Sequence, residues 1–310
     1  MESKFGHDPA SGARWEIHGP AEDIPVVEAW ADGYIPFQPA QTSWKRELRE
    51  EIRSRCELLE PSAGQVLHAT FFGAMPPRSD VENLALYNID EVFKSFRQAG
   101  RNGIRFEYGG EAPPLVPSGE TYPFGYRYKF APRDDEFVTA WKHGRSLASF
   151  GWTDLGEFDH GNRVLAQVWL ALTRGDVEPF FPVVAHDAKF AVKVQVRPPN
   201  GKDWVPGKLV KPMIDGVVCA FQAHTDTEEL TEIAERLAKN LPAYPEDLRR
   251  YLRDQCRAVL GSVPQLFFLF GAKDVKGNPS DDLCMAGELL PVEPIDDRWA
   301  IMGEIIEIFC

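Results

Sequence analysis

The chain has 310 residues, of which 44% are hydrophobic and 12% aromatic; this composition supports a large buried core and excludes wholesale disorder. Its length permits one large domain or two of ordinary size. The net charge of −13 is concentrated at the two ends and in the middle connection. No segment of the sequence has the excess of lysine and arginine that would predict the basic surface typical of nucleic-acid binders.

Five widely spaced cysteines without a CxxC pair predict free thiols in a reducing compartment. The first residues contain no hydrophobic signal region. No apolar run approaches the roughly 20 residues that span a bilayer. We therefore expect a soluble, cytoplasmic protein with no membrane partner.

The first forty residues are acidic and proline-bearing, which predicts an irregular but ordered arm. Apolar residues recur at helical spacing from Trp44 to Leu59 and predict an amphipathic surface helix. A β-prone run at 65–72 follows. After a turn, a second helical pattern begins near Asp80 and ends near Gln98.

Alternating patterns predict two further strands, at 104–108 and 122–130. Residues 134–150 are predicted to form a helix. The run 163–173 is apolar almost throughout, so periodicity alone fits either a buried strand or a buried helix, and we favour the strand.

The second half repeats the order of a strand followed by a helix. Residues 190–197 alternate strictly and predict a strand, and a Pro/Gly loop leads from it into a helix over 208–223. Two amphipathic patterns then predict a helical hairpin inserted at 226–261. The remaining strands are predicted at 264–271, 284–290 and 300–309.

Two carboxylates stand where the first strand passes into its helix. Residues i and i+2 of an extended segment point the same way, so Asp80 and Glu82 could hold one Mg²⁺, an ion that prefers oxygen ligands. Asn83 would supply a carbonyl ligand or cap the helix. The metal would polarise a phosphodiester and lower the pKa of a bound water. The same residues also fit an ordinary helix N-terminus with an acidic cap, and the residues alone favour that interpretation.

Other catalytic signatures are absent from the sequence, which has no GxSxG elbow, no Walker loop, no GxGxxG after a strand and no zincin-like helix. His68 lies within a strand, where a lone histidine is usually structural. Asp159 with His160, and His186 with Asp187, could act as acid–base pairs only within loops, because adjacent residues on a strand point in opposite directions.

The segment D-V-E-N-L from Asp80 to Leu84, with Asp90 after it, resembles the D-x-D-N-L…D strand–helix motif of RusA-type Holliday-junction resolvases. Those proteins are small Mg²⁺-dependent α/β nucleases that act as dimers. In that family the motif carboxylates bind metal, a lysine follows one turn into the helix, and an acidic pair lies after it. Here Leu86 occupies the lysine position, and no acidic pair follows at 103–108.

The helix at 208–223 resembles the complementary part of the same motif. Its segment L-V-K-P-M-I-D-G-V is similar to the family's L-x-K-x-x-x-D-x-L helix, with Lys211 at the lysine position and Asp215 at the helix-end position. Val205 and Gly207 stand where the opening carboxylates would be. Each half therefore keeps what the other half lacks.

After the helical hairpin, Asp281 and Asp282 resemble the family's acidic pair leading into a strand. The match covers roughly a third of the chain. It implies an α/β (α+β) fold in which two strand–helix units, at 41–155 and 156–310, follow the arm at 1–40 as a tandem pseudo-dimer. The molecule would then be a pseudo-dimeric monomer or a homodimer.

The resemblance implies a Mg²⁺-dependent nuclease-like protein that acts on or binds DNA or RNA. The implied metal ligands are Asp80, Glu82, Asn83, Asp281 and Asp282, and the implied catalytic residues are Asp80, Glu82 and Lys211, with Lys211 on the scissile phosphate. Because the subunits of family dimers carry separate sites and each half here is incomplete, we expect a retained fold with weakened or altered catalysis. One alternative is a non-catalytic module on the same scaffold that binds a protein partner or nucleic acid through its aromatic loops. Another is an unrelated enzyme that acts on a small substrate, which no motif in the sequence indicates.

Overall fold

The computed structural model describes residues 3–21, 24–37, 40–77, 79–157, 163–175, 177–179, 187–202 and 205–310. The strands of the large sheet are β1 (Ser3–His7), β2 (Arg14–His18), β3 (Val27–Ala31), β4 (Gln65–Phe72), β5 (Ile104–Tyr108), β6 (Phe124–Pro132), β7 (Lys142–Gly156), β8 (Val177–Pro179), β9 (Phe190–Arg197), β14 (Cys284–Pro291) and β15 (Trp299–Phe309). The helices are α1 (Ser43–Cys56), α2 (Arg163–Arg174), α3 (Val210–Ala220), α4 (Leu230–Ala238) and α5 (Pro245–Leu252), with short turns η1 (Asn83–Tyr87), η2 (Pro206–Lys208) and η3 (Gln255–Arg257). Two small sheets pair β10 (Ala223–His224) with β11 (Ser262–Val263) and β12 (Phe267–Phe270) with β13 (Asp274–Gly277).

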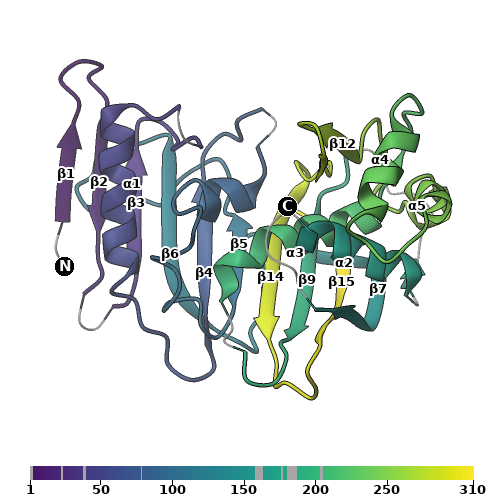
Figure 1. Cartoon of the computed structure of the whole chain (residues 1–310). Coiled ribbons are helices and arrows are strands. Elements are labelled where there is room, and N and C mark those ends of the chain that lie inside the picture. The colour runs from purple at the N-terminus through teal and green to yellow at the C-terminus, as the bar shows by residue number, and fades with distance from the viewer. Residues whose placement is uncertain are drawn as a thin grey trace.

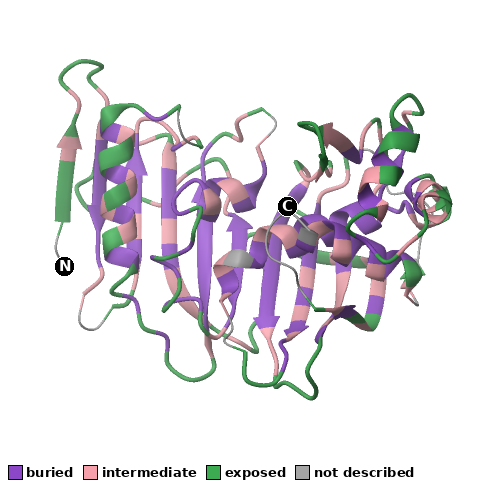
Figure 2. Cartoon of the chain, in the orientation of Figure 1, coloured by how far each residue is buried: buried purple, intermediate pink, exposed green. Residues whose placement is uncertain are grey.

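The described residues form a mixed α/β structure on one 11-stranded sheet, with strand order β1-β2-β3-β6-β4-β5-β14-β9-β15-β7-β8. Figure 1 shows α1, α2 and α3 in front of this sheet, with α4 and α5 to one side. The central strands are buried, and the exposed residues lie at the sheet ends, in the loops and on the outer faces of helices such as α1 (Figure 2).

The sheet has the same pairing pattern on both sides of its central strands. β5 and β14 pair antiparallel in the middle. Outward from β5 come a parallel strand, β4, and then two antiparallel strands, β6 and β3. Outward from β14 come a parallel strand, β9, and then two antiparallel strands, β15 and β7. The chain order is also alike, because β3-α1-β4-η1-β5-β6 matches β7-α2-β9-α3-β14-β15.

Several predicted elements are confirmed, because local pattern and burial agree. The helix predicted to begin at Trp44 is α1, whose apolar stripe is buried while its charged side faces solvent. The strands predicted at 65–72 and 190–197 are β4 and β9, and the helix predicted at 208–223 contains α3. The predicted hairpin is α4 with α5, which pack against each other.

Two predicted elements are wrong. Residues 134–150 do not form a helix; β7 occupies the later part and pairs along most of its length with β15, so a long-range ladder overrides the local pattern. The run 163–173 is not a strand but lies in α2, whose buried residues include Val168, Trp169 and Leu172. A buried helix and a buried strand carry the same apolar run, and here the length of the run indicated a helix.

The expectation of an irregular arm over 1–40 is also wrong, because β1, β2 and β3 extend the large sheet and bury Trp15 and Trp30. The helix expected to continue to Gln98 ends early, as η1 followed by turns. Asp90 explains this ending, because its carboxylate accepts the backbone N–H of Ser95 at 2.7 Å and so stabilises a turn in place of a helical bond.

The five cysteines are free, as predicted, with Cys56, Cys219 and Cys284 buried and Cys256 and Cys310 exposed. Burial raises the pKa of each of the three buried thiols well above its usual value, so these thiols stay protonated. No helix in the described part of the chain is both long and apolar enough to cross a membrane.

Candidate active site

Lys211, in the first turn of α3, lies at the centre of a group of carboxylates. Its Nζ atom is 3.6 Å from Asp80 Oδ2 and 3.4 Å from Glu82 Oε2. The same atom is 3.4 Å from Asp215 Oδ2 and 4.0 Å from Asp281 Oδ2. Four carboxylates from segments far apart in the sequence therefore share one ammonium group. We call these five residues the lysine–carboxylate cluster.

Asp80 is held in place by the residue that follows the motif carboxylates. The backbone N–H of Asn83 donates to Asp80 Oδ1 at 2.6 Å, and the Asn83 side-chain amide donates to Asp80 Oδ2. The first of these bonds is the helix-capping bond that the sequence favoured. Since Asp80 also contacts Lys211, capping and participation in the site occur together.

The second half positions the other members of the cluster. Lys211 and Asp215 are one turn apart on α3, and the Lys211 ammonium donates to Asp215 Oδ1 at 3.5 Å. Asp281 comes just before β14, and its backbone carbonyl accepts the N–H of Cys284 at 2.9 Å. The start of β14 and the first turns of α3 thus place Asp281, Lys211 and Asp215 close together.

Glu82 is the most deeply buried carboxylate of the cluster, at 4% exposure. Neither of its carboxylate oxygens accepts a hydrogen bond of good geometry from a described residue. Burial raises the pKa of Glu82 to about 8; Lys211 opposes this rise, and Asp80 and Asp215 add to it. Apart from its ion pair with Lys211, this buried acid has no hydrogen-bond donor among the described residues, which is costly to the fold unless a ligand or a proton satisfies its oxygens.

Two more carboxyls in the cluster also hold protons more tightly than usual. Burial raises the pKa of Asp281 to about 8, and Asp80 and Asp215 raise it further by repulsion. Burial raises the pKa of Asp215 to about 6 against the attraction of Lys211. The pKa of Lys211 itself lies well above its usual value, because the attraction of the carboxylates, Asp215 first, outweighs its burial. Near neutral pH the cluster therefore contains the Lys211 ammonium, which stays charged, and protons on the carboxyls. A divalent cation that binds the carboxylates would displace these protons.

We expect the Glu82→Gln substitution to remove a pH-dependent cost of folding. The unfolded Glu82 carboxyl ionises near its ordinary pKa of 4.5 and the folded one near 8, so the folded state binds more protons between these values. The unfolding free energy of the parent should therefore fall as pH rises from 4.5 to 8. Urea denaturation in EDTA at pH 5 and pH 9 should show the variant gaining stability relative to the parent at the higher pH. The exposed Glu111→Gln change is the control, and identical pH profiles for Glu82→Gln and the parent would contradict the assignment.

Some residues predicted for the site lie elsewhere. Asp282 is exposed and accepts the hydroxyl of Ser280 at 3.0 Å. Asp90, the helix-end aspartate of the first motif, is buried and bonds to the backbone N–H of Ser95. Leu86, at the lysine position of the first motif, is fully buried in the core. The first half therefore contributes only the opening carboxylates to the cluster.

Gly207 lies at a close approach between the two halves of the chain. A Cβ atom built on Gly207 would lie 1.8 Å from Cβ of Phe93, which belongs to the first half. A carboxylate side chain therefore does not fit at position 207.

The remaining candidates are separate from the cluster. His68 Nε2 lies 3.1 Å from Glu107 Oε2, and both side chains are buried, which fits the structural role predicted for this histidine. Glu107 also accepts the N–H of Thr139 at 2.6 Å. Asp159, His160 and His186 lie outside the described residues, so their proposed acid–base roles remain predictions.

Sequence reasoning missed two features of the site. It treated Asp215 only as a motif match, although its spacing four residues after Lys211 indicated an ion pair on one helix face. It also expected separate sites in the two halves, whereas Asp80 and Glu82 meet Lys211 directly. Distance in the sequence concealed this convergence.

Within the described residues, no group of three or more histidines, cysteines, aspartates or glutamates has the geometry to hold a metal ion. In the lysine–carboxylate cluster the carboxylate oxygens surround an ammonium group instead. No protein-family model matches this sequence, and comparison with curated proteins gives no significant match.

Proposed function

We propose that this chain is a metal-dependent phosphodiester hydrolase with a RusA-like architecture, in which two halves of one chain supply a single composite site. The observation that carries the proposal is the convergence of Asp80 and Glu82 with Lys211. These residues belong to two complementary fragments of one nuclease motif, about 130 positions apart. Asp281, the third motif element, joins the same cluster.

The sheet topology supports a tandem pseudo-dimer. The matching strand orders run outward from the antiparallel pair β5–β14, and such a pair has a local twofold between its strands. A dimer that joins its sheets through equivalent central strands would give this arrangement after gene duplication and fusion. The α4–α5 hairpin lies between α3 and β14, whereas the equivalent connection from η1 to β5 contains no helix, which supports an insertion at 226–261.

The donor type suits Mg²⁺ or Mn²⁺, although in the described structure the carboxylates surround the Lys211 ammonium and not a metal-sized space. Carboxylate oxygens are the preferred ligands of these hard ions, and the Glu82 oxygens, which accept no hydrogen bond of good geometry from a described residue, support a further ligand there. Asp80, Glu82 and Asp281 would hold the ion, with Asn83 orienting Asp80. When bound, such an ion polarises a phosphodiester and activates a water molecule.

The protein's own groups then have distinct roles. Lys211 remains protonated, so it would act as a fixed positive charge against the scissile phosphate and stabilise the charge that develops there. Asp215 holds the Lys211 ammonium toward the cluster through its hydrogen bond. Asp80, fixed by two bonds from Asn83, is pre-organised and needs no reordering when the site is used.

A metal titration followed by thermal unfolding tests this proposal. At a hundredfold excess of Mn²⁺ over its Kd, the gain is about 2.7 kcal/mol, which raises Tm by roughly 4 °C for a chain of this size. The shift should be larger at pH 8 than at pH 6, because protons on Glu82 and Asp281 compete with the ion at the lower pH. Asp80→Asn should abolish the shift, and Asp282→Asn, outside the cluster, should retain it.

Cleavage of a labelled four-way DNA junction and of single-stranded DNA, with Mn²⁺ present, gives the second readout. The parent should cut at least one of these substrates and Asp80→Asn should not. The non-catalytic alternative is favoured by one observation, namely that the Lys211 ammonium already neutralises the carboxylates. A chain that binds metal but cuts neither DNA would support that alternative, and the absence of any Tm shift at 10 mM metal would refute the metal site itself.

A further inference from the structure

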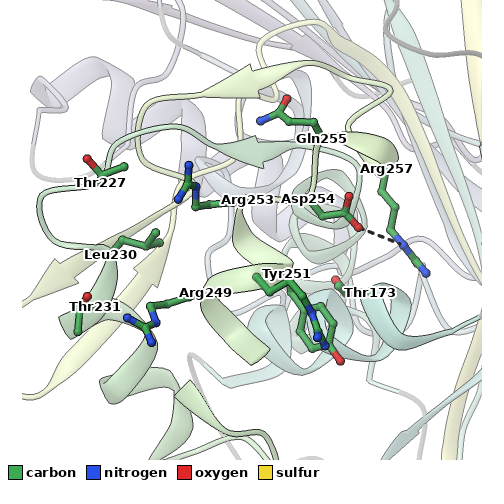
Figure 3. Close-up of a pocket in the computed structure, with 11 residues that line it drawn as sticks. Thr173, Thr227, Leu230, Thr231, Arg249, Tyr251, Arg253, Asp254, Gln255 and Arg257 are labelled. Atoms are coloured by element: carbon green, nitrogen blue, oxygen red, sulfur yellow. Dashed lines mark ion pairs between the residues drawn. The ribbon is translucent and has the colours of Figure 1, made fainter. Parts of the chain in front are cut away.

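A cavity of about 880 Å³ beside the α4–α5 hairpin is lined by four arginines and one acidic residue. The arginines are Arg249, Arg250, Arg253 and Arg257, and the acid is Asp254 (Figure 3). The lining thus has three more positive than negative charges in a chain whose net charge is −13. We call this cavity the arginine pocket.

The pocket arises from the spacing of the arginines. Arg249 and Arg253 are four residues apart at the end of α5, which brings them to one side of the helix, whereas Arg257 lies in η3, after the extended Asp254. The surrounding segment also contains many acidic residues, so its average charge concealed the cluster. The chain therefore has a local basic surface at the arginine pocket, although its overall composition is acidic.

Two guanidinium groups in the pocket are available to a ligand. Arg253 is exposed, and its side chain forms no hydrogen bond or ion pair with any residue that the structure describes. Arg249 has a weak surface partner, Glu246, at 3.6 Å, and the Glu246 side chain is 73% exposed. Figure 3 shows Arg249 and Arg253 pointing toward Thr231 and Thr227.

The other arginines build the wall of the pocket. Arg257 donates to the backbone carbonyls of Leu172 at 2.8 Å and Gly175 at 3.2 Å, which ties the turn after α5 to the end of α2. Arg250 pairs with Asp247 at 2.9 Å. The pocket therefore combines a wall held by Arg257 with Arg253, which has no partner among the described residues, and with Arg249 and Arg250, which form exposed surface pairs.

We propose that the arginine pocket binds the phosphate backbone of a nucleic-acid strand, as a contact separate from the lysine–carboxylate cluster. Guanidinium groups recognise phosphates with paired N–H donors, and the exposed hydroxyls of Thr227 and Thr231 add donors of the kind that contact phosphates without reading sequence. The choice of nucleic acid as the ligand rests on the proposed function. The inference adds the surface that would attract an anionic strand to an otherwise acidic protein.

The test is equilibrium binding of a fluorescein-labelled four-way DNA junction to the full-length protein, read by anisotropy in EDTA. We expect Arg253→Glu to raise Kd at least tenfold, and Arg46→Glu, an exposed arginine of α1, to stay within twofold of the parent. The Arg249→Ala/Arg253→Ala double variant should lower the slope of log Kd against log salt by about 2, one for each lost phosphate contact. Unchanged Tm values would show that all variants are folded.

Three results would overturn the inference: no DNA binding by the parent at low salt, equal weakening by Arg253→Glu and Arg46→Glu, or loss of ATP binding in Arg253→Glu with DNA binding intact. The last result would assign the pocket to a small phosphate compound. Asp80→Asn separates this inference from the proposed function, because it should lose cleavage and keep the parent's Kd. If cleavage is absent from the parent but Arg253→Glu still weakens DNA binding, only the hydrolase proposal fails.

Discussion

Replacement of Lys211 by methionine should lower the unfolding free energy by about 3 kcal/mol at pH 8 in EDTA. The substitution leaves four carboxylates within one buried cluster without their shared cation, and removing one partner of a buried pair is costly. The cost should be smaller at pH 5, where protonation neutralises the carboxyls whose pKa values are raised to about 8. Urea denaturation at the two pH values measures this difference.

The same substitution should change metal binding and cleavage in opposite directions. In the parent the Lys211 ammonium repels a divalent cation and competes with it for the carboxylates. Without the ammonium this competition is absent, so Mn²⁺ should stabilise Lys211→Met more than it stabilises the parent. Cleavage at saturating Mn²⁺ should nevertheless fall by about 10² to 10³, the usual loss when one donor to a developing anion is removed. A purely structural lysine would not give this combination of tighter metal binding and lost activity.

Lys211→Arg is the matched control for charge. It retains the positive charge in the cluster, so its stability should stay close to that of the parent at both pH values, although its planar head group suits the site less well. If Lys211→Met unfolds with the same pH dependence as the parent, the ammonium does not neutralise the cluster and the composite site is refuted.

Several residues that the sequence singled out lie together in the structure, whereas some of the elements around them were predicted wrongly. Asp80, Glu82, Lys211 and Asp281 were identified from short motif fragments, because metal and phosphate chemistry restricts residue type and spacing. Their meeting in one cluster was not predictable, because it depends on a central strand pair between segments about 180 residues apart. Asp282 was named for the site by its motif position but is exposed and lies outside the cluster. Motif position alone therefore did not distinguish it from Asp281.

Two of the errors in the fold have a common physical origin. The helix predicted at 134–150 is overridden by the β7–β15 ladder, and the arm expected at 1–40 is recruited as edge strands of the same sheet. Both depend on pairing between distant segments, to which local propensity is insensitive. The strand β9, by contrast, was predictable because its own alternation matches its burial.

Replacement of Arg105 by methionine should lower the unfolding free energy by about 4 kcal/mol, or roughly 6 °C in Tm for a chain of this size. Arg105 on β5 faces Glu288 on β14 in the central strand pair, and both side chains are 1% exposed. Arg105 also donates to the carbonyls of Pro132, Arg133 and Asp135. The substitution would leave a buried carboxylate and three carbonyls without their donor.

A second cross-strand pair on the same sheet provides the control. Arg127 on β6 faces Glu28 on β3 at 2.6 Å, but these side chains are 29% and 24% exposed, so Arg127→Met should cost no more than about 1 kcal/mol. Adding Glu288→Met to Arg105→Met should recover part of the loss, because it removes the uncompensated charge, and chemical denaturation of all four proteins measures both differences. Equal costs for Arg105→Met and Arg127→Met would mean that the β5–β14 junction is not held by its buried ion pair. In that case the two halves would depend on the β5–β14 backbone ladder and on apolar packing to keep Asp80 and Glu82 beside Lys211.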